Sequence, residues 1–249
     1  MSNTLDPGKG GHRQRLREKF LNTGHSGFAD YELLELFLTY AIPRKDVKPI
    51  AKQLMAEFKT LGGVFDASIQ ELSAVAGIGE NAAVMLKLVR ALCVRYLQSN
   101  IQCLPYMDHV TKFYDYARMR LGDLSDEVMM VFFLNAKNYL IKEEILGLGT
   151  TDQVNVFPNK IAKHALMNDA KAVVLCHNHP SGVVTPSIDD TQTTYTVKRI
   201  LKPLDIILLD HIIVSKFAYY SYREEDAHKP AAYKVLDAIP GPQNPGRKA

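Results

Sequence analysis

The chain has 249 residues, with 30 basic and 27 acidic side chains for a formal net charge of +3, and 47% of its residues are hydrophobic. This length lets one large domain or two ordinary ones bury a full core, so the fold needs neither disulfides nor a metal for its stability. The 3 cysteines, Cys93, Cys103 and Cys176, include no C-x-x-C pair, which argues against a secreted disulfide framework and a thiolate zinc site.

The first residues are polar and Gly-rich, and no apolar stretch reaches the roughly 18 residues needed to span a bilayer. We therefore expect a cytoplasmic protein with no membrane partner. Residues 1–100 hold 13 basic and 10 acidic side chains, so the net positive charge lies there. Its densest part, residues 9–19, is either a solvated helix face or a basic arm that contacts phosphate.

From residue 30 to residue 97 the apolar residues recur at helical spacing, which predicts at least four helices. Gly and Pro interrupt the pattern at residues 42–44, 62–63 and 77–79. The pattern of residues 72–86 resembles a helix–hairpin–helix element, whose Gly turn exposes backbone N–H groups to a DNA phosphate. The same pattern also serves as plain helix packing, and Glu80 follows the turn where a basic residue would help DNA binding.

If this element contacts DNA, we expect Lys87, Arg90 and Arg95 to support it. DNA contact is therefore an expectation for residues 1–100 alone. The sequence identifies neither a particular substrate nor an oligomeric state.

After a junction near residues 99–105 the pattern changes to short apolar runs rich in branched residues, which are typical of buried strands. Helical patterns lie between these runs, so the fold class is a mixed α/β (α+β) domain behind an all-α one. The expected strands are residues 128–134, 140–141, 145–148, 172–176 and 206–214, and the expected helices are 159–169 and 187–201. The expected domains are residues 1–100 (helical) and 101–223 (α/β), with 224–249 as a flexible, Pro-rich tail.

The candidate functional residues follow the apolar run that ends at Cys176. His177 and His179 are two apart, so on a strand they project from one face and can converge on one ion. Ser187 and Asp190 share a helical face near the start of the next expected helix. Two imidazoles and one carboxylate leave one coordination position open, as in catalytic zinc sites. The alternatives are a hydrogen-bonded turn for the histidines and a capping box for Ser187 and Asp190.

The spacing His-x-His-x7-Ser-x2-Asp resembles the JAMM motif of MPN-domain metallopeptidases. The string His-Asn-His-Pro-Ser-Gly at residues 177–182 and Leu-Asp-His-Ile-Ile at 209–213 resemble the bacterial RadC family. The resemblance covers roughly residues 12–222 and implies an MPN-type mixed sheet with flanking helices. One departure is Pro158-Asn159-Lys160, where the family has Pro-Arg-Glu.

This resemblance implies that His177, His179 and Asp190 bind one zinc ion per chain. It also implies that Ser187 hydrogen-bonds the developing oxyanion or the water, and that an upstream glutamate is the general base. Glu143 and Glu144 precede a strand that ends in Gly-Thr, as such a glutamate does in the family. Adjacent strand residues face opposite sides, so only one of them can face the metal, and Glu144 is the preferred candidate.

These residue types favour a zinc-dependent hydrolase, a metallopeptidase or isopeptidase that cleaves an amide in a peptide or protein substrate. A metal-dependent nuclease is a second hypothesis, although only one ligand set is evident where two-metal sites are expected. A third is a DNA-binding repair or recombination accessory protein whose metal site is structural or vestigial. Cys176 as a nucleophile is disfavoured, because strand parity turns it away from the histidines.

Overall fold

The computed structural model describes residues 7–150, 153–154, 158–228 and 235–236. The chain divides into two compact units, residues 1–93 and 94–249. Among the described residues, no helix is both long and apolar enough to cross a membrane. An all-helical region thus precedes a mixed sheet with flanking helices, which confirms the expected fold class.

The first unit is built from helices packed on one apolar core. That core includes Leu38, Leu54, Leu72 and Leu86, each without exposed surface. The helices are α1 (Pro7–Thr23), η1 (His25–Gly27), α2 (Asp30–Ala41), α3 (Lys48–Phe58), α4 (Leu61–Asp66), α5 (Ile69–Ala74) and α6 (Glu80–Gln102), the last of which continues into the second unit.

The turn between α5 and α6 depends on glycine. Gly77 has φ of +93°, and a Cβ built on it would lie 2.7 Å from Cδ1 of Ile50. Helix α5 begins with a capping box, in which Ser68 Oγ accepts from the Glu71 N–H and the Glu71 carboxylate accepts from the Ser68 N–H. These contacts explain the Gly-rich hairpin as a turn that lets the helices pack together.

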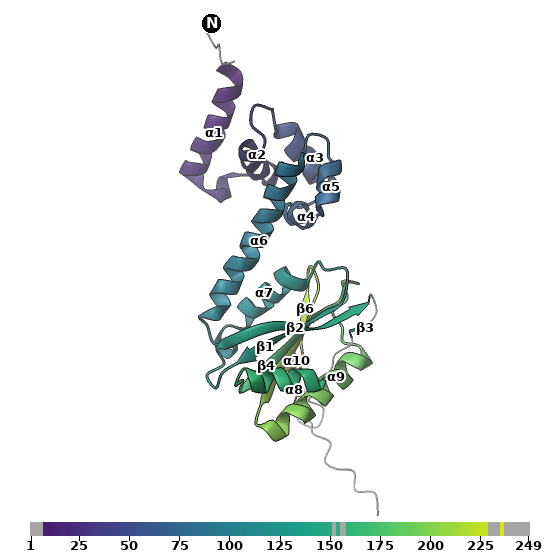
Figure 1. Ribbon diagram of the computed structural model, residues 1–249. Helices are drawn as coiled ribbons and strands as arrows, with labels where there is room; N and C mark the ends of the chain where they lie inside the picture. Colours follow the sequence, from purple (N-terminus) through teal and green to yellow (C-terminus); the bar gives the residue numbers. More distant parts are fainter. Residues whose placement is uncertain (1–6, 151–152, 155–157, 229–234, 237–249) are drawn as a thin grey trace, which may run out of the picture. The chain divides into compact units, whose positions relative to one another are not determined.

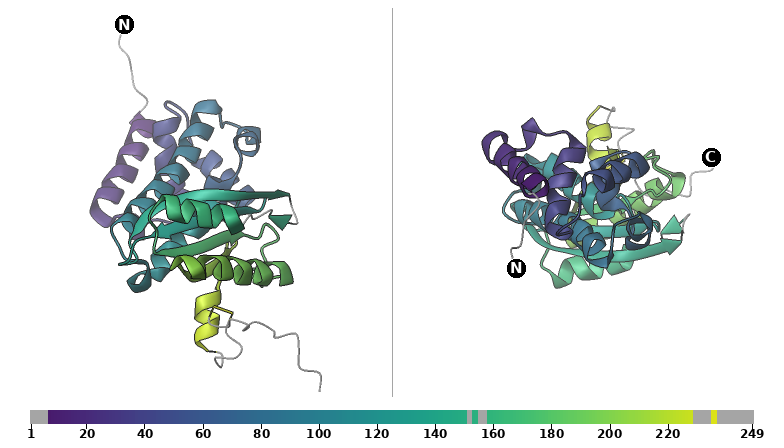
Figure 2. Two further views of the ribbon diagram at one scale, coloured as in Figure 1. Left: turned by 60° about the horizontal axis from the view of Figure 1, so that its bottom comes forward. Right: turned by 90° about the horizontal axis from the view of Figure 1, so that it is seen from above.

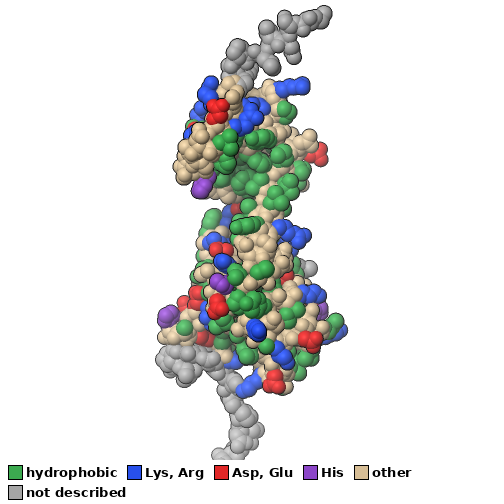
Figure 3. All heavy atoms as spheres, turned by 90° about the vertical axis from the view of Figure 1, so that its left-hand side faces the viewer, with side chains coloured by type: hydrophobic (Ala, Val, Ile, Leu, Met, Phe, Trp, Pro, Cys, Tyr) green, Lys and Arg blue, Asp and Glu red, His purple; other side chains and the backbone are tan. Residues whose placement is uncertain are grey.

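Two of the basic residues expected to support DNA contact are engaged inside the first unit. Lys87 Nζ donates to the carbonyls of Phe65 (3.0 Å), Asp66 (3.0 Å) and Ala67 (2.8 Å), at the end of α4. Arg90 Nε forms an ion pair with Asp66 at 2.9 Å. On the face drawn in Figure 3, basic side chains of the described residues are scattered among acidic and apolar ones. DNA contact by residues 1–100 stays a prediction.

The basic arm is also partly engaged. Arg13 guanidinium nitrogens donate to three carbonyls at and beyond the end of α2, and Lys19 pairs with Glu32 at 2.8 Å. These contacts attach α1 to α2 and stabilise the carbonyls that a helix end leaves without partners.

Replacing Lys87 by Met should destabilise the first unit. Its ammonium group accounts for three hydrogen bonds to main-chain carbonyls, and hydrogen bonds to a charged group contribute about 1.5–3 kcal/mol. We expect Lys87→Met to lower the free energy of unfolding by that amount in urea titrations of the full chain. Arg95→Met is the matched control on the same helix, with an expected change within about 0.5 kcal/mol. Equal effects of the two substitutions would contradict this role for Lys87.

The described residues of the second unit form a six-stranded sheet in the order β3-β2-β1-β4-β5-β6, in which β4 and β5 are parallel and the other neighbours are antiparallel. Helix α9 makes the crossover between these two strands, as parallel neighbours require. The strands are β1 (Val128–Leu134), β2 (Leu140–Thr150), β3 (Gln153–Val154), β4 (Ala172–Asn178), β5 (Ile207–Val214) and β6 (Tyr219–Ser221). The helices are η2 (Tyr106–Asp108), α7 (Val110–Leu121), α8 (Pro158–Met167), α9 (Ile188–Leu201), η3 (Lys202–Leu204) and α10 (Tyr222–Ala227).

Each face of the sheet has its own core (Figures 1 and 2). Helices α8 and α9 cover one face, and α7 covers the other. Strand β1 is buried on both faces, so Val131 lies in the α8/α9 core and Phe132 in the α7 core. Every second residue of a strand therefore reaches the same core, and this parity decides which side chains can share a site.

The end of the chain contributes to the second unit. Residues 224–227, expected to begin a flexible tail, belong to α10, and Asp226 is buried. Val235 and Leu236 are buried in the α8/α9 core, which attracts apolar side chains from beyond α10. Residues 229–234 and 237–249 of the expected tail lie outside the described residues.

Candidate metal centre

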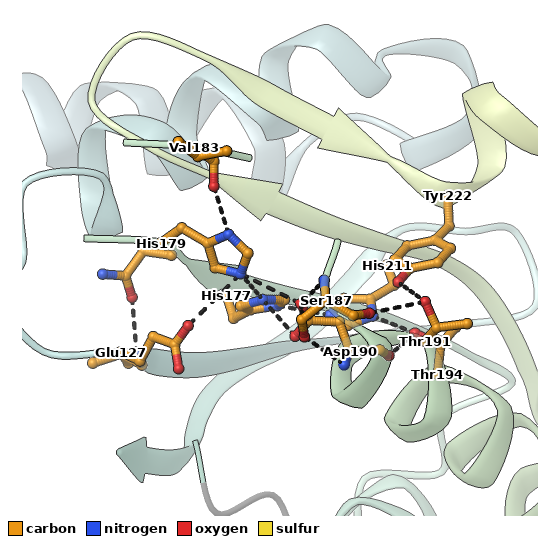
Figure 4. Close-up of polar contacts among 12 residues, drawn as sticks. Glu127, His177, His179, Val183, Ser187, Asp190, Thr191, Thr194, His211 and Tyr222 are labelled. Carbon is orange, nitrogen blue, oxygen red and sulfur yellow. Dashed lines mark hydrogen bonds and ion pairs between the residues drawn. The ribbon is translucent and has the colours of Figure 1, made fainter. Parts of the chain in front are cut away.

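Two imidazoles converge at the end of β4 (Figure 4). His177 is the last residue but one of this strand and is 1% exposed, and His179 follows the strand directly. Their ring centroids are 4.8 Å apart, and their Nε2 atoms are 3.0 Å apart. The structure therefore brings together the two histidines that the sequence singled out.

Asp190 reaches both imidazoles from the first turn of α9. Its Oδ1 lies 3.0 Å from Nε2 of His177, and its Oδ2 lies 3.4 Å from Nε2 of His179. Ser187 is the N-cap of this helix, and its hydroxyl donates to Asp190 Oδ2 at 2.6 Å. The capping box is therefore present, and the carboxylate that completes it also faces the histidines. No contact shows Ser187 as an oxyanion donor, so that role stays a prediction.

A second carboxylate, which sequence reasoning missed, lies beside the histidines. Glu127 precedes β1, and its Oε1 is 3.7 Å from Nε2 of His179. Ligand atoms of Glu127, His177 and His179 all lie within 4.8 Å of one another. The pairing of Met129 in β1 with His177 in antiparallel β4 brings Glu127 opposite His179.

Asn178, between the two histidines, holds the segment that carries Glu127. Its side chain is fully buried on the other face of β4. Its Nδ2 donates to the carbonyls of Leu124 (3.3 Å) and Asp126 (3.0 Å), and its Oδ1 accepts from the N–H of Val128 (2.8 Å). A buried amide with all these partners fixes the backbone on both sides of Glu127.

The nitrogen and oxygen atoms of His177, His179 and Asp190 fit a divalent metal ion. The Nδ1 atom of His179 lies 2.7 Å from the carbonyl oxygen of Val183, which can only accept, so Nδ1 carries the proton of the neutral ring. Nε2 of His179 then presents a lone pair towards His177 and Asp190. Ligand atoms around one tetrahedral zinc ion are separated by about 3.3 Å, given bonds of about 2.0–2.1 Å. The separations of 3.0 and 3.4 Å found here are close to that value.

The charges of the cluster support one another. Burial raises the pKa of Asp190, but hydrogen bonds and charge from His177 and His179 outweigh it and hold that pKa far below its usual range. Burial lowers the pKa of His179, but contacts with Asp190, the Val183 carbonyl and Glu127 raise it overall. The low pKa of Asp190 keeps its carboxylate ionised, and the raised pKa of His179 shows that Asp190 and Glu127 favour a positive charge beside that ring.

Glu144, the predicted base, is not brought to this cluster. It faces the same side of the sheet as His177, but it pairs with Val131 in β1, which in turn pairs with Leu175 in β4. Its carboxylate contacts Lys142 and His164, and these contacts lower its pKa against the opposing effect of burial. The strand that carries Glu144 is separated from β4 by β1, and its carboxylate is already paired, so the structure favours another residue as the base while the role of Glu144 stays a prediction.

Other candidates take structural roles. Glu143 faces the α7 side, where it accepts hydrogen bonds from Tyr116 (2.5 Å) and Gln98 (3.1 Å). Cys176 lies in the α7 core, and burial raises the pKa of its thiol well above the usual range, so a thiolate nucleophile is disfavoured. Pro158, Asn159 and Lys160 form the first turn of α8.

Comparisons with known proteins cover both units. A family model described as a RadC-like JAB domain matches residues 107–227, and one described as UPF0758 N-terminal matches residues 11–84. The UPF0758 protein of Fusobacterium nucleatum is 40% identical over 222 residues, which cover 86% of this chain and 96% of that protein. UPF0758 proteins of Ruegeria pomeroyi (38% over 214 residues, 86% and 96%) and Pseudoalteromonas translucida (39% over 211 residues, 85% and 94%) are similarly related.

Proposed function

The chain belongs to the UPF0758 family and carries a RadC-like JAB domain with a cluster able to hold a metal ion, and from this premise we propose that it is a zinc-dependent hydrolase that cleaves an amide bond. The observation that carries the proposal is the convergence of the His177 and His179 Nε2 atoms on the Asp190 carboxylate, with Glu127 beside them. Two imidazoles and one carboxylate form the ligand set of catalytic zinc sites, which leave one position open.

The proposed roles follow from the contacts of each side chain. His177, His179 and Asp190 would hold the ion, since their ligand atoms are the closest to one another. A bound zinc ion would supply a Lewis acid that polarises the substrate carbonyl and lowers the pKa of water towards 7. Glu127 would take the proton of the attacking water and deliver it to the leaving amine. The Ser187 hydroxyl would hydrogen-bond the developing oxyanion after turning from Asp190.

The surroundings of the cluster favour a peptide or protein substrate over a nucleic acid. The carboxylates of Glu127, Asp189 and Asp190 would repel a phosphodiester backbone. Val183 (61% exposed), whose carbonyl contacts His179, and Ile188 (78% exposed), two residues before Asp190 in α9, offer apolar side chains that can contact an apolar substrate residue. A two-metal nuclease would also need a second ligand set, and the described part of the chain shows one such group.

Metal analysis of the purified full chain tests the ligand assignment. We expect about one zinc ion per chain, reduced to background in the double variant His177→Ala/His179→Ala, because two of three ligands are lost. His164→Ala is the matched control, since His164 faces the same side of the sheet beside Glu144 and should leave the zinc content unchanged. Full zinc content in the double variant would refute the assignment.

Incubation of the zinc-loaded protein with a peptide library and with isopeptide-linked substrates, read by mass spectrometry, tests the reaction. Cleavage should disappear with a chelator and return when zinc is added. Zinc-loaded protein that cleaves neither kind of amide would refute the hydrolase proposal.

A further inference from the structure

A buried chain of hydrogen bonds leads away from the candidate metal ligands (Figure 4). Nδ1 of His177 lies 2.8 Å from Nε2 of His211, and Nδ1 of His211 lies 2.6 Å from Oγ1 of Thr194. The Thr194 hydroxyl also lies 2.6 Å from the main-chain carbonyl oxygen of Asp190. His211 and Thr194 have no exposed surface, so water does not compete for these contacts.

Metal binding would fix the direction of every proton in this chain. A metal ion on Nε2 of His177 requires the proton of the neutral ring to sit on Nδ1, which then donates to Nε2 of His211. The proton of His211 must therefore sit on its Nδ1 and point at Thr194. The hydroxyl accepts this bond and turns its own proton to the Asp190 carbonyl, which can only accept.

The opposite direction satisfies the contacts among the His177, His211 and Thr194 side chains only while Nε2 of His177 carries a proton. Thr194 would then donate to His211, and His211 Nε2–H would donate to Nδ1 of His177. The Nε2–H of His177 would point at Nε2 of His179 or Oδ1 of Asp190, each 3.0 Å away, where it excludes a metal ion. The bond from Thr194 to the Asp190 carbonyl would also be lost.

We propose that Thr194 and His211 are positioning residues that select the metal-binding tautomer of His177 and tie it to the backbone of Asp190. This inference rests on the proposed metal site. Asp190 and Thr194 are one turn apart on α9, so the Thr194 hydroxyl links the backbone of Asp190 to His177 through His211. Tyr222 stacks on His211, with ring centroids 5.3 Å apart and planes at 10°, and keeps the imidazole in the plane that these bonds need.

Zinc affinity of the full-length protein, measured by competition with a chelator, tests the role of Thr194. Thr194→Val keeps the shape but removes the hydroxyl, and loss of such an outer partner lowers metal affinity by about 10–100-fold. Thr194→Ser retains the hydroxyl and should bind zinc within about threefold of the parent chain. Thr196→Val, on the same helix, is the matched control and should leave the affinity unchanged. Unchanged affinity in Thr194→Val would overturn the inference.

Nitrogen NMR of protein labelled on histidine tests the tautomers without a substrate. In the zinc-loaded chain, His177 and His211 should both carry their proton on Nδ1, and a proton on Nε2 of His211 would overturn the inference. A parent chain that binds no zinc would overturn both the metal site and this inference. Zinc binding with these tautomers but without amide cleavage would refute the hydrolase proposal alone and support the inference.

Discussion

Replacing Glu127 by Gln should lower amide cleavage by about 10²–10⁴-fold, the usual contribution of a general base, while the zinc content stays that of the parent chain. The amide has nearly the shape of the carboxylate but cannot take a proton from water. Glu127 Oε1 lies 3.7 Å from Nε2 of His179, whereas Asp190 approaches both imidazoles more closely. These distances favour Asp190 as the ligand and Glu127 as the base. Rates of peptide cleavage and metal analysis of the same samples check both parts.

Glu144→Gln is the matched control, because it makes the same chemical change on the same side of the sheet. Its carboxylate contacts Lys142 and His164, so we expect cleavage within a few-fold of the parent rate. A loss of zinc in Glu127→Gln would make Glu127 a ligand and contradict its role as the base. Undiminished cleavage in Glu127→Gln together with a large loss in Glu144→Gln would make Glu144 the base.

Glu127 and Glu144 show that only the site residues close together in the sequence can be predicted from their spacing. His177, His179 and Asp190 are separated by a strand end, a turn and the first turn of a helix, so their spacing alone predicts a common site. Glu127 is 50 residues from His177, and only the antiparallel register of β1 and β4 brings it to the histidines. A single sequence carries no direct signal for that register.

Strand parity gives the side of the sheet that Glu144 faces but not its distance from the histidines. It places Glu144 on the same face as His177, as expected, but it does not give the number of strands between them. The strand order β2-β1-β4 separates these side chains, and Lys142 and His164 then satisfy the carboxylate. Which strands are neighbours is a property of the whole sheet, whereas parity is a property of one strand.

The sequence predicts the fold class better than it predicts the partners of the charged side chains. The apolar run of residues 128–134 coincides with β1, since a strand covered on both faces has no polar positions. The expected strands at 140–141 and 145–148 are instead one strand, β2, because polar side chains such as Lys142 are tolerated at its exposed positions. The sequence offers Lys87 and Arg13 as cations for phosphate. In the structure both donate to carbonyls at helix ends of the first unit, since a carbonyl without a partner attracts the nearest cation.

Replacing Asp210 by Ala should lower the free energy of unfolding of the second unit by about 3–5 kcal/mol. The Asp210 side chain is fully buried in β5, and it is a focus for donors from several elements. It accepts hydrogen bonds from the hydroxyls of Tyr106 (2.7 Å), Tyr114 (3.2 Å) and Ser221 (2.8 Å) and from the N–H groups of His211 (2.7 Å) and Arg223 (3.1 Å). Alanine leaves these donors buried without their acceptor, and each such loss is costly.

Urea unfolding of the full chain, followed separately for each unit, measures this effect, because two units need not unfold in one transition. Asp115→Ala removes a carboxylate that is 58% exposed and pairs with Arg118 at 3.4 Å, so its effect should stay within about 0.5 kcal/mol. Asp210→Asn keeps one acceptor oxygen and should fall between the two alanine variants. If Asp210→Ala were as stable as Asp115→Ala, water or rearranged side chains would have to satisfy the donors. Asp210 would then have no role in holding η2, α7 and β6 against β5.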